Sequence, residues 1–313
     1  MSVFTPVTEN QARTWLKNYT LGQLVKLEGI AAGIENTNFF LTTTHGEYVL
    51  TLFEKLTMDE LPFYIDLMAH LSHRGIPCPL PIEKTDGEYL GLLNGKPACI
   101  VTKLAGKPIH TPLSTHCAEV GRMLAEMHVA GNSYKGRMEN WRGPKWWNSF
   151  VHQVLPLLPK DEADLASNEL SFQANQNYAS LPQGVIHGDL FRDNFLFTDD
   201  HIGGIIDFYF SCNEALLFDL AITVNDWCVR DDATLDTTLA NDLIRAYHAT
   251  RALTDIEQQA WPAILRAAAF RTWLGRLGYT YFPQSGEMTH TKDHGHSQRL
   301  LEYHTTNTYQ LPI

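Results

Sequence analysis

Three features are missing from this sequence, and each absence argues against a class of protein. The five cysteines are scattered, odd in number and never arranged as C-x-x-C, which favours reduced thiols in the cytoplasm over a disulfide framework or a zinc site. No uncharged apolar run is long enough to span a bilayer, and the first residues do not resemble a signal peptide. A Lys/Arg tract is also missing, and the formal net charge of -11 repels phosphate backbones and anionic membrane surfaces. We therefore expect neither nucleic acid nor a membrane as a partner.

The chain has 313 residues, of which 44% are hydrophobic, and is long enough for two lobes. The first hundred residues favour strands, with a hairpin turn at residues 45–47. After Val101 the pattern becomes mostly helical, with strand-like interruptions at 185–197 and 202–208. Helical spacing predicts helices over 59–74, 114–129, 146–158, 161–178, 235–248 and 256–277. The sequence thus predicts an α+β protein with a small β-rich lobe over residues 1–102 and a larger, mostly helical lobe over 103–313.

One motif carries most of the chemical information. It consists of His187-Gly188-Asp189, of Asn194 five residues further on, and of Asp207 at the end of an apolar strand. Phosphoryl transfer needs an acceptor hydroxyl aimed at the γ-phosphorus and cations that neutralise the phosphate oxygens. Asp189 would orient the hydroxyl and accept its proton, although an aspartate in such a turn would by itself equally suit a helix cap. Asn194 and Asp207 would supply oxygen ligands to Mg²⁺, which prefers hard donors and keeps several waters.

The pattern H-x-D-x-x-x-x-N followed by I-D-F is typical of kinases. With glycine in its second position it resembles the aminoglycoside phosphotransferase/choline kinase branch of the protein-kinase-like fold. A helix ending in Leu-Ala-Glu-Met-His at His128 and the Asp-Leu-Ala segment at Asp219 resemble the same branch. The resemblance implies a two-lobed kinase with ATP as co-substrate and Mg²⁺, and structural roles for His187, Asp193 and Asp219. Because the chain between Asp207 and Asp219 is too short for an activation segment, we expect a small-molecule acceptor.

The nucleotide-binding residues are expected in the first lobe. A Gly/Asn-rich turn occupies the place of the phosphate-covering loop, and its backbone N–H groups would form an anion nest. The candidates in this turn are Gly33, Asn36 and Asn38. Thr51 stands where the family has a phosphate-gripping lysine. Either Lys55, with Glu54 or Glu60 as its partner, takes this role, or backbone amides and Mg²⁺ hold the triphosphate. The residues expected beside adenine are Lys103 and Leu104.

Over nearly its full length the sequence resembles the homoserine kinases of this branch, including the segments at residues 33–40, 46–53, 206–213 and 225–227. The resemblance implies that ATP and L-homoserine give ADP and O-phospho-L-homoserine in threonine biosynthesis. Homoserine is a zwitterion, so its site should offer an acid and a cation. Asp226, beside Trp227, is the candidate for the ammonium group. Arg271 or Arg276 would hold the carboxylate, but not both, because five positions turn a helix by about 140°. The remaining candidates for contact with the acceptor are Arg192 and Tyr209.

Two other functions stay open at this point. One is an aminoglycoside or amino-alcohol (choline-like) phosphotransferase, and the other is a catalytically inactive relative that binds nucleotide. Residues 303–313 contain no carboxylate side chain, which counts against a polycationic aminoglycoside. The histidines of the segment 290–296 are expected on a mobile surface loop, not in a metal site. The sequence leaves a monomer and a homodimer equally open.

Overall fold

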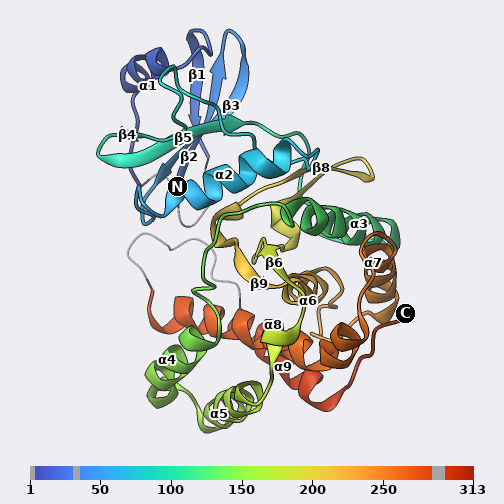
Figure 1. The fold of residues 1–313 in the computed structure, drawn as a ribbon. Helices are drawn as coiled ribbons and strands as arrows, with labels where there is room; N and C mark the ends of the chain where they lie inside the picture. The colour runs from blue at the N-terminus through green and yellow to red at the C-terminus, as the bar shows by residue number, and fades with distance from the viewer. Residues whose placement is uncertain (1–3, 31–35, 284–292) are drawn as a thin grey trace. The chain divides into compact units, whose positions relative to one another are not determined.

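The computed structural model describes residues 4–30, 36–283 and 293–313, and these form two compact units (Figure 1). The first unit contains the described residues up to 105 together with 204–206. The second contains residues 106–203, 207–283 and 293–313.

The first unit is built on an antiparallel sheet with the strand order β1-β2-β3-β5-β4. Its strands are β1 (Leu24–Gly29), β2 (Asn36–Thr43), β3 (Gly46–Phe53), β4 (Gly91–Leu93) and β5 (Lys96–Thr102). The predicted hairpin is confirmed, since β2 and β3 pair from Thr43 opposite Gly46 to Asn36 opposite Phe53.

Alternation along the strands gives this sheet two different faces. Phe39, Leu50 and Ile100 lie on one face and form a core with Trp15 of helix α1 (Glu9–Trp15). Helix α2 (Leu61–Ser72) runs beside the sheet, as Figure 1 shows, and ends close to the predicted position. The sequence did not reveal α1, which is only 7 residues long.

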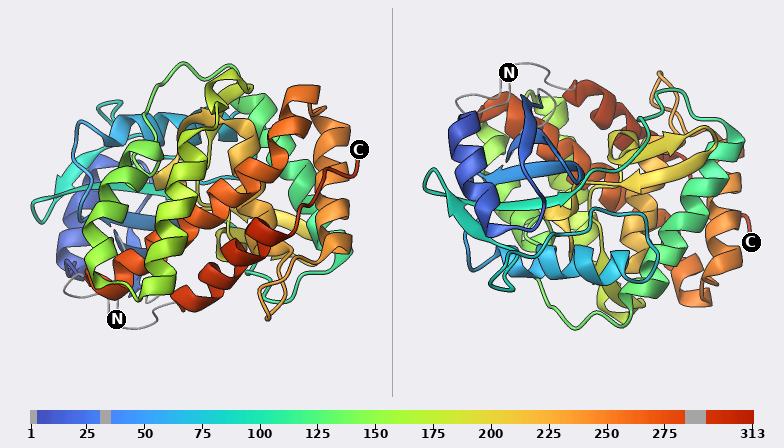
Figure 2. Two further views of the ribbon diagram at one scale, coloured as in Figure 1. Left: turned by 90° about the horizontal axis from the view of Figure 1, so that it is seen from below. Right: turned by 90° about the horizontal axis from the view of Figure 1, so that it is seen from above.

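The second unit is mostly helical. Its helices are α3 (Ser114–Gly131), α4 (Pro144–Val154), α5 (Lys160–Ala174), α6 (Leu216–Trp227), α7 (Thr237–Thr250), α8 (Asp255–Tyr281) and α9 (His294–Thr306). Helices α3 and α7 pack with their backbones in near contact, because a Cβ on Gly121 would lie 2.0 Å from the carbonyl oxygen of Leu243. Figure 2 shows α8 and α9 running beside each other at the C-terminal end of the chain.

Two short strand pairs accompany these helices. Strand β6 (Gln183–Ile186) pairs antiparallel with β9 (Cys212–Ala215), and β7 (Phe195–Thr198) pairs with β8 (His201–Ile205). The chain segments that follow β6 and β8 carry the predicted catalytic and metal-binding residues.

Five helices of the second unit, α3, α4, α5, α7 and α8, confirm their predictions, whereas α6 and α9 were not predicted. Helix α6 is buried around almost its whole circumference, and a largely apolar run of this kind does not by its spacing distinguish a buried helix from a buried strand. The expected loop over 290–296 is wrong for its last three residues, because Asp293 accepts a hydrogen bond from the backbone N–H of Gly295 and caps α9. His290 lies outside the described residues.

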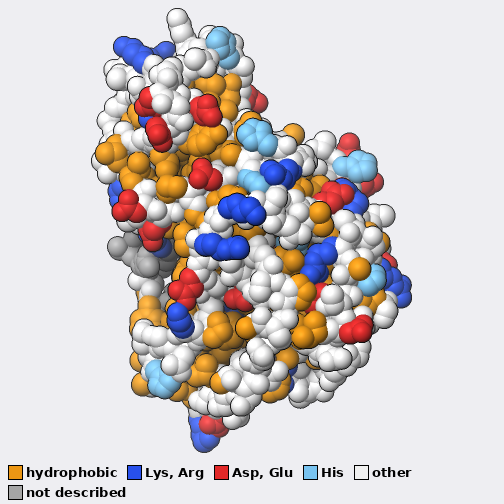
Figure 3. Space-filling view, viewed as in Figure 1, with side chains coloured by type: hydrophobic (Ala, Val, Ile, Leu, Met, Phe, Trp, Pro, Cys, Tyr) orange, Lys and Arg blue, Asp and Glu red, His pale blue; other side chains and the backbone are white. Residues whose placement is uncertain are grey.

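Acidic and basic side chains are interspersed on the face of the molecule drawn in Figure 3. Among the residues that the structure describes, no helix combines the length and the apolar character needed to cross a membrane.

Candidate active site

The structure places the predicted catalytic carboxylate just after β6. The chain leaves the strand at Ile186 and turns through His187 and Gly188, which has a left-handed φ of 78°. A Cβ at Gly188 would lie 2.6 Å from the carbonyl oxygen of Phe210, so this close approach of two backbone segments requires glycine. Asp189 therefore leaves the turn in a fixed direction.

Asp219, in the first turn of α6, holds this turn in place. Its fully buried carboxylate accepts hydrogen bonds from the backbone N–H groups of His187, at 2.8 Å, and Gly188, at 2.9 Å. The Nε2 atom of His128 lies 3.2 Å from the same carboxylate. Burial opposes ionisation of Asp219, but its hydrogen bonds with His128 and the backbone prevail and lower its pKa. This geometry agrees with the structural role that the family resemblance implied for Asp219.

A chain of buried polar groups continues from Asp219 to α7 and α8. Burial lowers the pKa of His128, so its neutral ring donates Nε2–H to Asp219 and accepts a hydrogen bond at Nδ1 from the Tyr247 hydroxyl, 2.7 Å away. Arg251 donates to the Tyr247 hydroxyl at 3.2 Å and to the carboxylate of Glu257 at 2.9 Å. The catalytic turn is thus supported by groups distant in the sequence.

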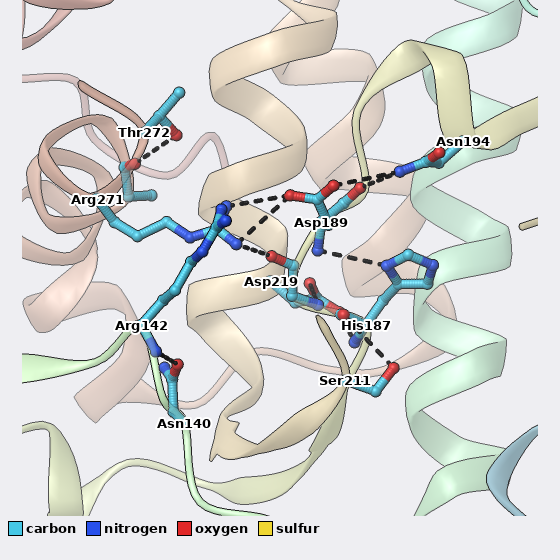
Figure 4. A network of polar contacts seen from close by, with 11 residues as sticks. Asn140, Arg142, His187, Asp189, Asn194, Ser211, Asp219, Arg271 and Thr272 are labelled. Carbon is cyan, nitrogen blue, oxygen red and sulfur yellow. Dashed lines mark hydrogen bonds and ion pairs between the residues drawn. The ribbon is translucent and has the colours of Figure 1, made fainter. Parts of the chain in front are cut away.

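Asp189 itself lies between a guanidinium and an amide group (Figure 4). On one side Arg271 of α8 approaches Oδ1 at 3.4 Å and donates to the carbonyl oxygen of Gly188 at 2.6 Å. On the other side Asn194 donates from Nδ2 to the backbone oxygen of Asp189 at 2.7 Å. Burial lowers the pKa of Arg271 and the charge of Asp189 opposes that shift, so the guanidinium stays protonated at neutral pH. The result is a carboxylate held in one orientation beside a fixed cation.

The two predicted metal ligands, Asn194 and Asp207, have the donor atoms that Mg²⁺ prefers. Because Asn194 uses its amide nitrogen on Asp189, its Oδ1 is the atom that remains for a cation. Asp207 has an exposed side chain and a φ of 67°, directly before the 3₁₀ turn Phe208–Phe210. This turn packs on the catalytic turn, since the rings of Phe208 and His187 have centroids 4.5 Å apart. One amide and one carboxylate oxygen suit Mg²⁺, which takes its other ligands from phosphate and water.

Two of the predicted acceptor-binding residues, Arg192 and Asp226, line a pocket of about 320 Å³ in the second unit. Within it, Asp226 Oδ2 accepts hydrogen bonds from the backbone N–H of Arg192, at 2.7 Å, and from its Nε, at 3.2 Å. Arg276, the alternative to Arg271, lines this pocket, whereas Arg271 faces Asp189. The two arginines lie on different faces of α8, as their spacing predicted.

The other two acceptor candidates are placed differently. Trp227 is only 1% exposed and packs against Phe195 and Phe197, with ring centroids 5.5 and 5.8 Å away. It is therefore a core residue and not a wall of the pocket, because its neighbour Asp226 faces the pocket and one helix position turns the side chain by about 100°. Tyr209 is half-buried in the turn that follows Asp207.

In the first unit, Gly33 lies outside the described residues, and Asn36 begins β2. The Thr51 hydroxyl donates to Asn38 Oδ1 at 2.8 Å, so these two side chains bond to each other across the sheet. Lys55 is exposed just beyond β3. Glu54, one of its two expected partners, pairs instead with Lys96 of β5 at 3.1 Å. Sequence reasoning missed Lys96 because its position opposite Glu54 depends on strand register.

The two residues expected beside adenine, Lys103 and Leu104, directly follow β5. Lys103 pairs with Glu47 at 3.2 Å and lies 4.9 Å from the ring centroid of Phe40. Leu104 packs against the backbone at Gly204, where an added Cβ would lie 2.7 Å from its Cδ1.

A second missed residue is Arg142, in the loop between α3 and α4. Its guanidinium carbon lies 4.3 Å from the ring centroid of Phe210 and 4.6 Å from that of Trp141. The sequence offered only a weak signal, the consecutive Trp141-Arg142 in a loop. Among the described residues, no group of three His, Cys, Asp or Glu side chains is arranged to hold a metal ion, His294 and His296 included.

Comparison with known proteins identifies the family. Residues 26–253 match the model of the phosphotransferase enzyme family. The chain belongs to this family. The chain is 51% identical to a homoserine kinase from Methylobacillus flagellatus over 303 residues, which cover 97% of this chain and 95% of that protein. It is 48% identical to a homoserine kinase from Paraburkholderia phytofirmans over 320 residues, which cover 98% and 96% of the two chains.

Solved structures of more distant phosphotransferases have the same fold. An amicoumacin kinase in complex with AMP-PNP and Ca²⁺ superposes with a TM-score of 0.71 at 15% identity, covering 96% of this chain and 92% of that one. The choline kinase of Streptococcus pneumoniae superposes with a TM-score of 0.67 at 13% identity, covering 96% and 99%. The predicted α+β protein-kinase-like fold is therefore confirmed.

Proposed function

We propose that this phosphotransferase transfers the γ-phosphoryl group of ATP to the hydroxyl of L-homoserine, giving ADP and O-phospho-L-homoserine for threonine biosynthesis. The observation that carries this proposal is the 51% identity to a homoserine kinase over 97% of the chain. The fixed orientation of the Asp189 carboxylate between Asn194 and Arg271 also supports it, because a catalytically inactive relative would not need this orientation.

In the proposed reaction Asp189 accepts a hydrogen bond from the acceptor hydroxyl and aims its oxygen at the γ-phosphorus. As the new P–O bond forms, the hydroxyl proton passes to Asp189, and the bond from the γ-phosphorus to the bridging oxygen breaks to release ADP. Arg271 supports this step by holding both Asp189 Oδ1 and the carbonyl oxygen of Gly188, which leaves the carboxylate little rotational freedom.

We further propose that Asn194 Oδ1 and Asp207 hold Mg²⁺, whose charge neutralises the phosphate oxygens. Residues 1–102 are proposed to bind ATP and residues 103–313 to bind the acceptor. The proposed nucleotide contacts are Gly33, Asn36, Asn38, Lys55, Lys103 and Leu104. We also propose a cytoplasmic location, which is supported by the five cysteines being free and buried.

The proposed acceptor contacts include Arg192, Tyr209 and Asp226. Asp226 is suited to the ammonium group because both hydrogen bonds from Arg192 reach its Oδ2, which leaves Oδ1 for another donor. The two hydrogen bonds from Arg192 hold that carboxylate in one position.

A coupled assay of ADP release tests the proposal. The purified protein with Mg²⁺-ATP is offered L-homoserine, choline and kanamycin at equal concentrations, with the Asp189→Asn variant as a blank. We expect ADP release with L-homoserine well above that with the other two acceptors. Turnover of choline or kanamycin without turnover of homoserine would show that homoserine is not the acceptor. No turnover of any of the three alcohols would refute the proposed kinase activity.

A further inference from the structure

Two guanidinium groups converge on the catalytic carboxylate. Figure 4 shows the side chains of Arg142 and Arg271 meeting on the same side of Asp189, with Asn194 on the opposite side. Both guanidinium carbons lie over one ring, since that of Arg142 is 4.3 Å and that of Arg271 is 5.9 Å from the Phe210 centroid. Two cationic side chains therefore lie on one side of the Asp189 carboxylate.

The two arginines differ in what they already bind. Arg271 uses its terminal nitrogens on Asp189 and on the carbonyl oxygen of Gly188. Arg142 has no carboxylate partner in the described ranges, and its Nε is buried there without a hydrogen-bond acceptor. A guanidinium that is partly removed from water without an anion is costly, so its placement indicates that an anionic ligand completes the site.

Arg142 is nonetheless held in place. The stacked rings of Trp141 and Phe210, with centroids 5.4 Å apart at an interplanar angle of 26°, carry the guanidinium on their faces. The Asn140 side chain accepts a hydrogen bond from the backbone N–H of Arg142 at 3.0 Å and donates to Glu214 at 3.1 Å. The cation is thus preorganised, as a recognition residue should be.

Resting on the proposed function, we propose that Arg142 binds the α-carboxylate of the amino-acid acceptor and thereby selects homoserine over amino-alcohols. Four bonds separate the hydroxyl oxygen of homoserine from its carboxylate carbon, a span of roughly 5 Å at ~1.5 Å per bond. With the hydroxyl at Asp189, the carboxylate of homoserine thus remains close to the Asp189 side chain. Beside it, Arg142 offers unused N–H donors, whose planar arrangement matches the two oxygens of a carboxylate.

A phosphate oxygen is the other anion that such a site attracts. The proposed metal ligand Asn194 lies on the opposite side of Asp189 in Figure 4. Because the nucleotide phosphates bind the metal ion, we expect them on that side. The position of Arg142 therefore favours the carboxylate, and the experiment separates the two anions.

The test uses Arg142→Gln with three acceptors: L-homoserine, 4-hydroxybutyrate, which lacks the ammonium group, and 3-aminopropan-1-ol, which lacks the carboxylate. The truncated acceptors are measured by turnover, or by their inhibition constants against homoserine where they turn over poorly. We expect kcat/KM for L-homoserine to fall about 10- to 100-fold, the loss typical of a charged hydrogen bond. The affinity for 4-hydroxybutyrate should fall likewise, and that for 3-aminopropan-1-ol should stay within about twofold.

Arg137→Gln is the matched control, because it removes the same charge from an exposed position of the same loop and should change none of these values. Arg142→Lys should recover part of the activity with homoserine, and a melting curve of each variant excludes misfolding as the cause. An equal loss with all three acceptors, or a change confined to the KM for ATP, would overturn the carboxylate assignment. Failure of the wild-type protein to phosphorylate homoserine is a separate result, which would refute the proposed function itself.

Discussion

Gly188→Ala is the substitution whose effect the structure specifies most closely. At a φ of 78°, any residue with a Cβ suffers a left-handed strain of about 1–2 kcal/mol. In addition, the new Cβ would lie 2.6 Å from the carbonyl oxygen of Phe210, a backbone atom that no side-chain rotation can move away. Overpacking of this kind typically costs about 1–3 kcal/mol more. We therefore expect the variant to lose about 2–5 kcal/mol of stability in total.

The same collision should impair catalysis. To reach ordinary contact distance the two segments must separate by roughly 1 Å. Asp189 follows Gly188 directly and moves with it, and a displacement of about 1 Å at a reacting group costs about 100-fold in rate. We expect kcat for ADP release to fall by about this factor.

Gly95→Ala is the matched control, because Gly95 has the same φ of 78° but its added Cβ would meet no atom within 4 Å. It should lose only the strain of about 1–2 kcal/mol and keep its kcat. Urea unfolding midpoints and steady-state rates of both variants decide the matter. If Gly188→Ala keeps a kcat within twofold of wild type and loses no more stability than Gly95→Ala, the collision has no consequence and the reasoning is refuted.

Three further predictions concern single side chains. Asp189→Asn should lower kcat by orders of magnitude and leave ATP affinity unchanged; retention of the wild-type kcat would remove this residue from the mechanism. Asp207→Ala should abolish Mg²⁺-dependent ATP binding in calorimetry, and an unchanged affinity would contradict its role as a ligand. Burial lowers the pKa of His304 from 6.5 to about 4, so that as the pH falls this histidine is protonated in the unfolded chain before it is protonated in the folded protein. Stability should then fall by about 3 kcal/mol as the pH drops from 6.5 towards 4. In the His304→Gln variant, whose side chain can still donate a hydrogen bond to Asn225, the urea unfolding midpoint should fall less between pH 6.5 and 4. A pH profile identical to that of the wild type would show that His304 does not cause the loss of stability.

Local sequence was sufficient for features whose physical cause is local. The hairpin at Gly46, the amphipathic helices and the family motif around Asp189 follow from turn chemistry, apolar spacing and residue order. The short segment between Asp207 and Asp219 likewise argued for a small acceptor. Helix α6 was not predicted because its largely apolar run, buried on almost all sides, is equally compatible with a buried strand.

The partners of the catalytic residues were decided by the tertiary structure. Arg271 lies 82 positions from Asp189, and only the packing of α8 turns Arg271 towards Asp189 and Arg276 towards the pocket. The same holds for Lys96 beside Glu54 and for Arg142 on the ring of Phe210, whose positions depend on strand register and on a loop between helices. Sequence patterns report which side chains share one element, whereas the contact of a charge with its partner on another element depends on how the whole chain packs.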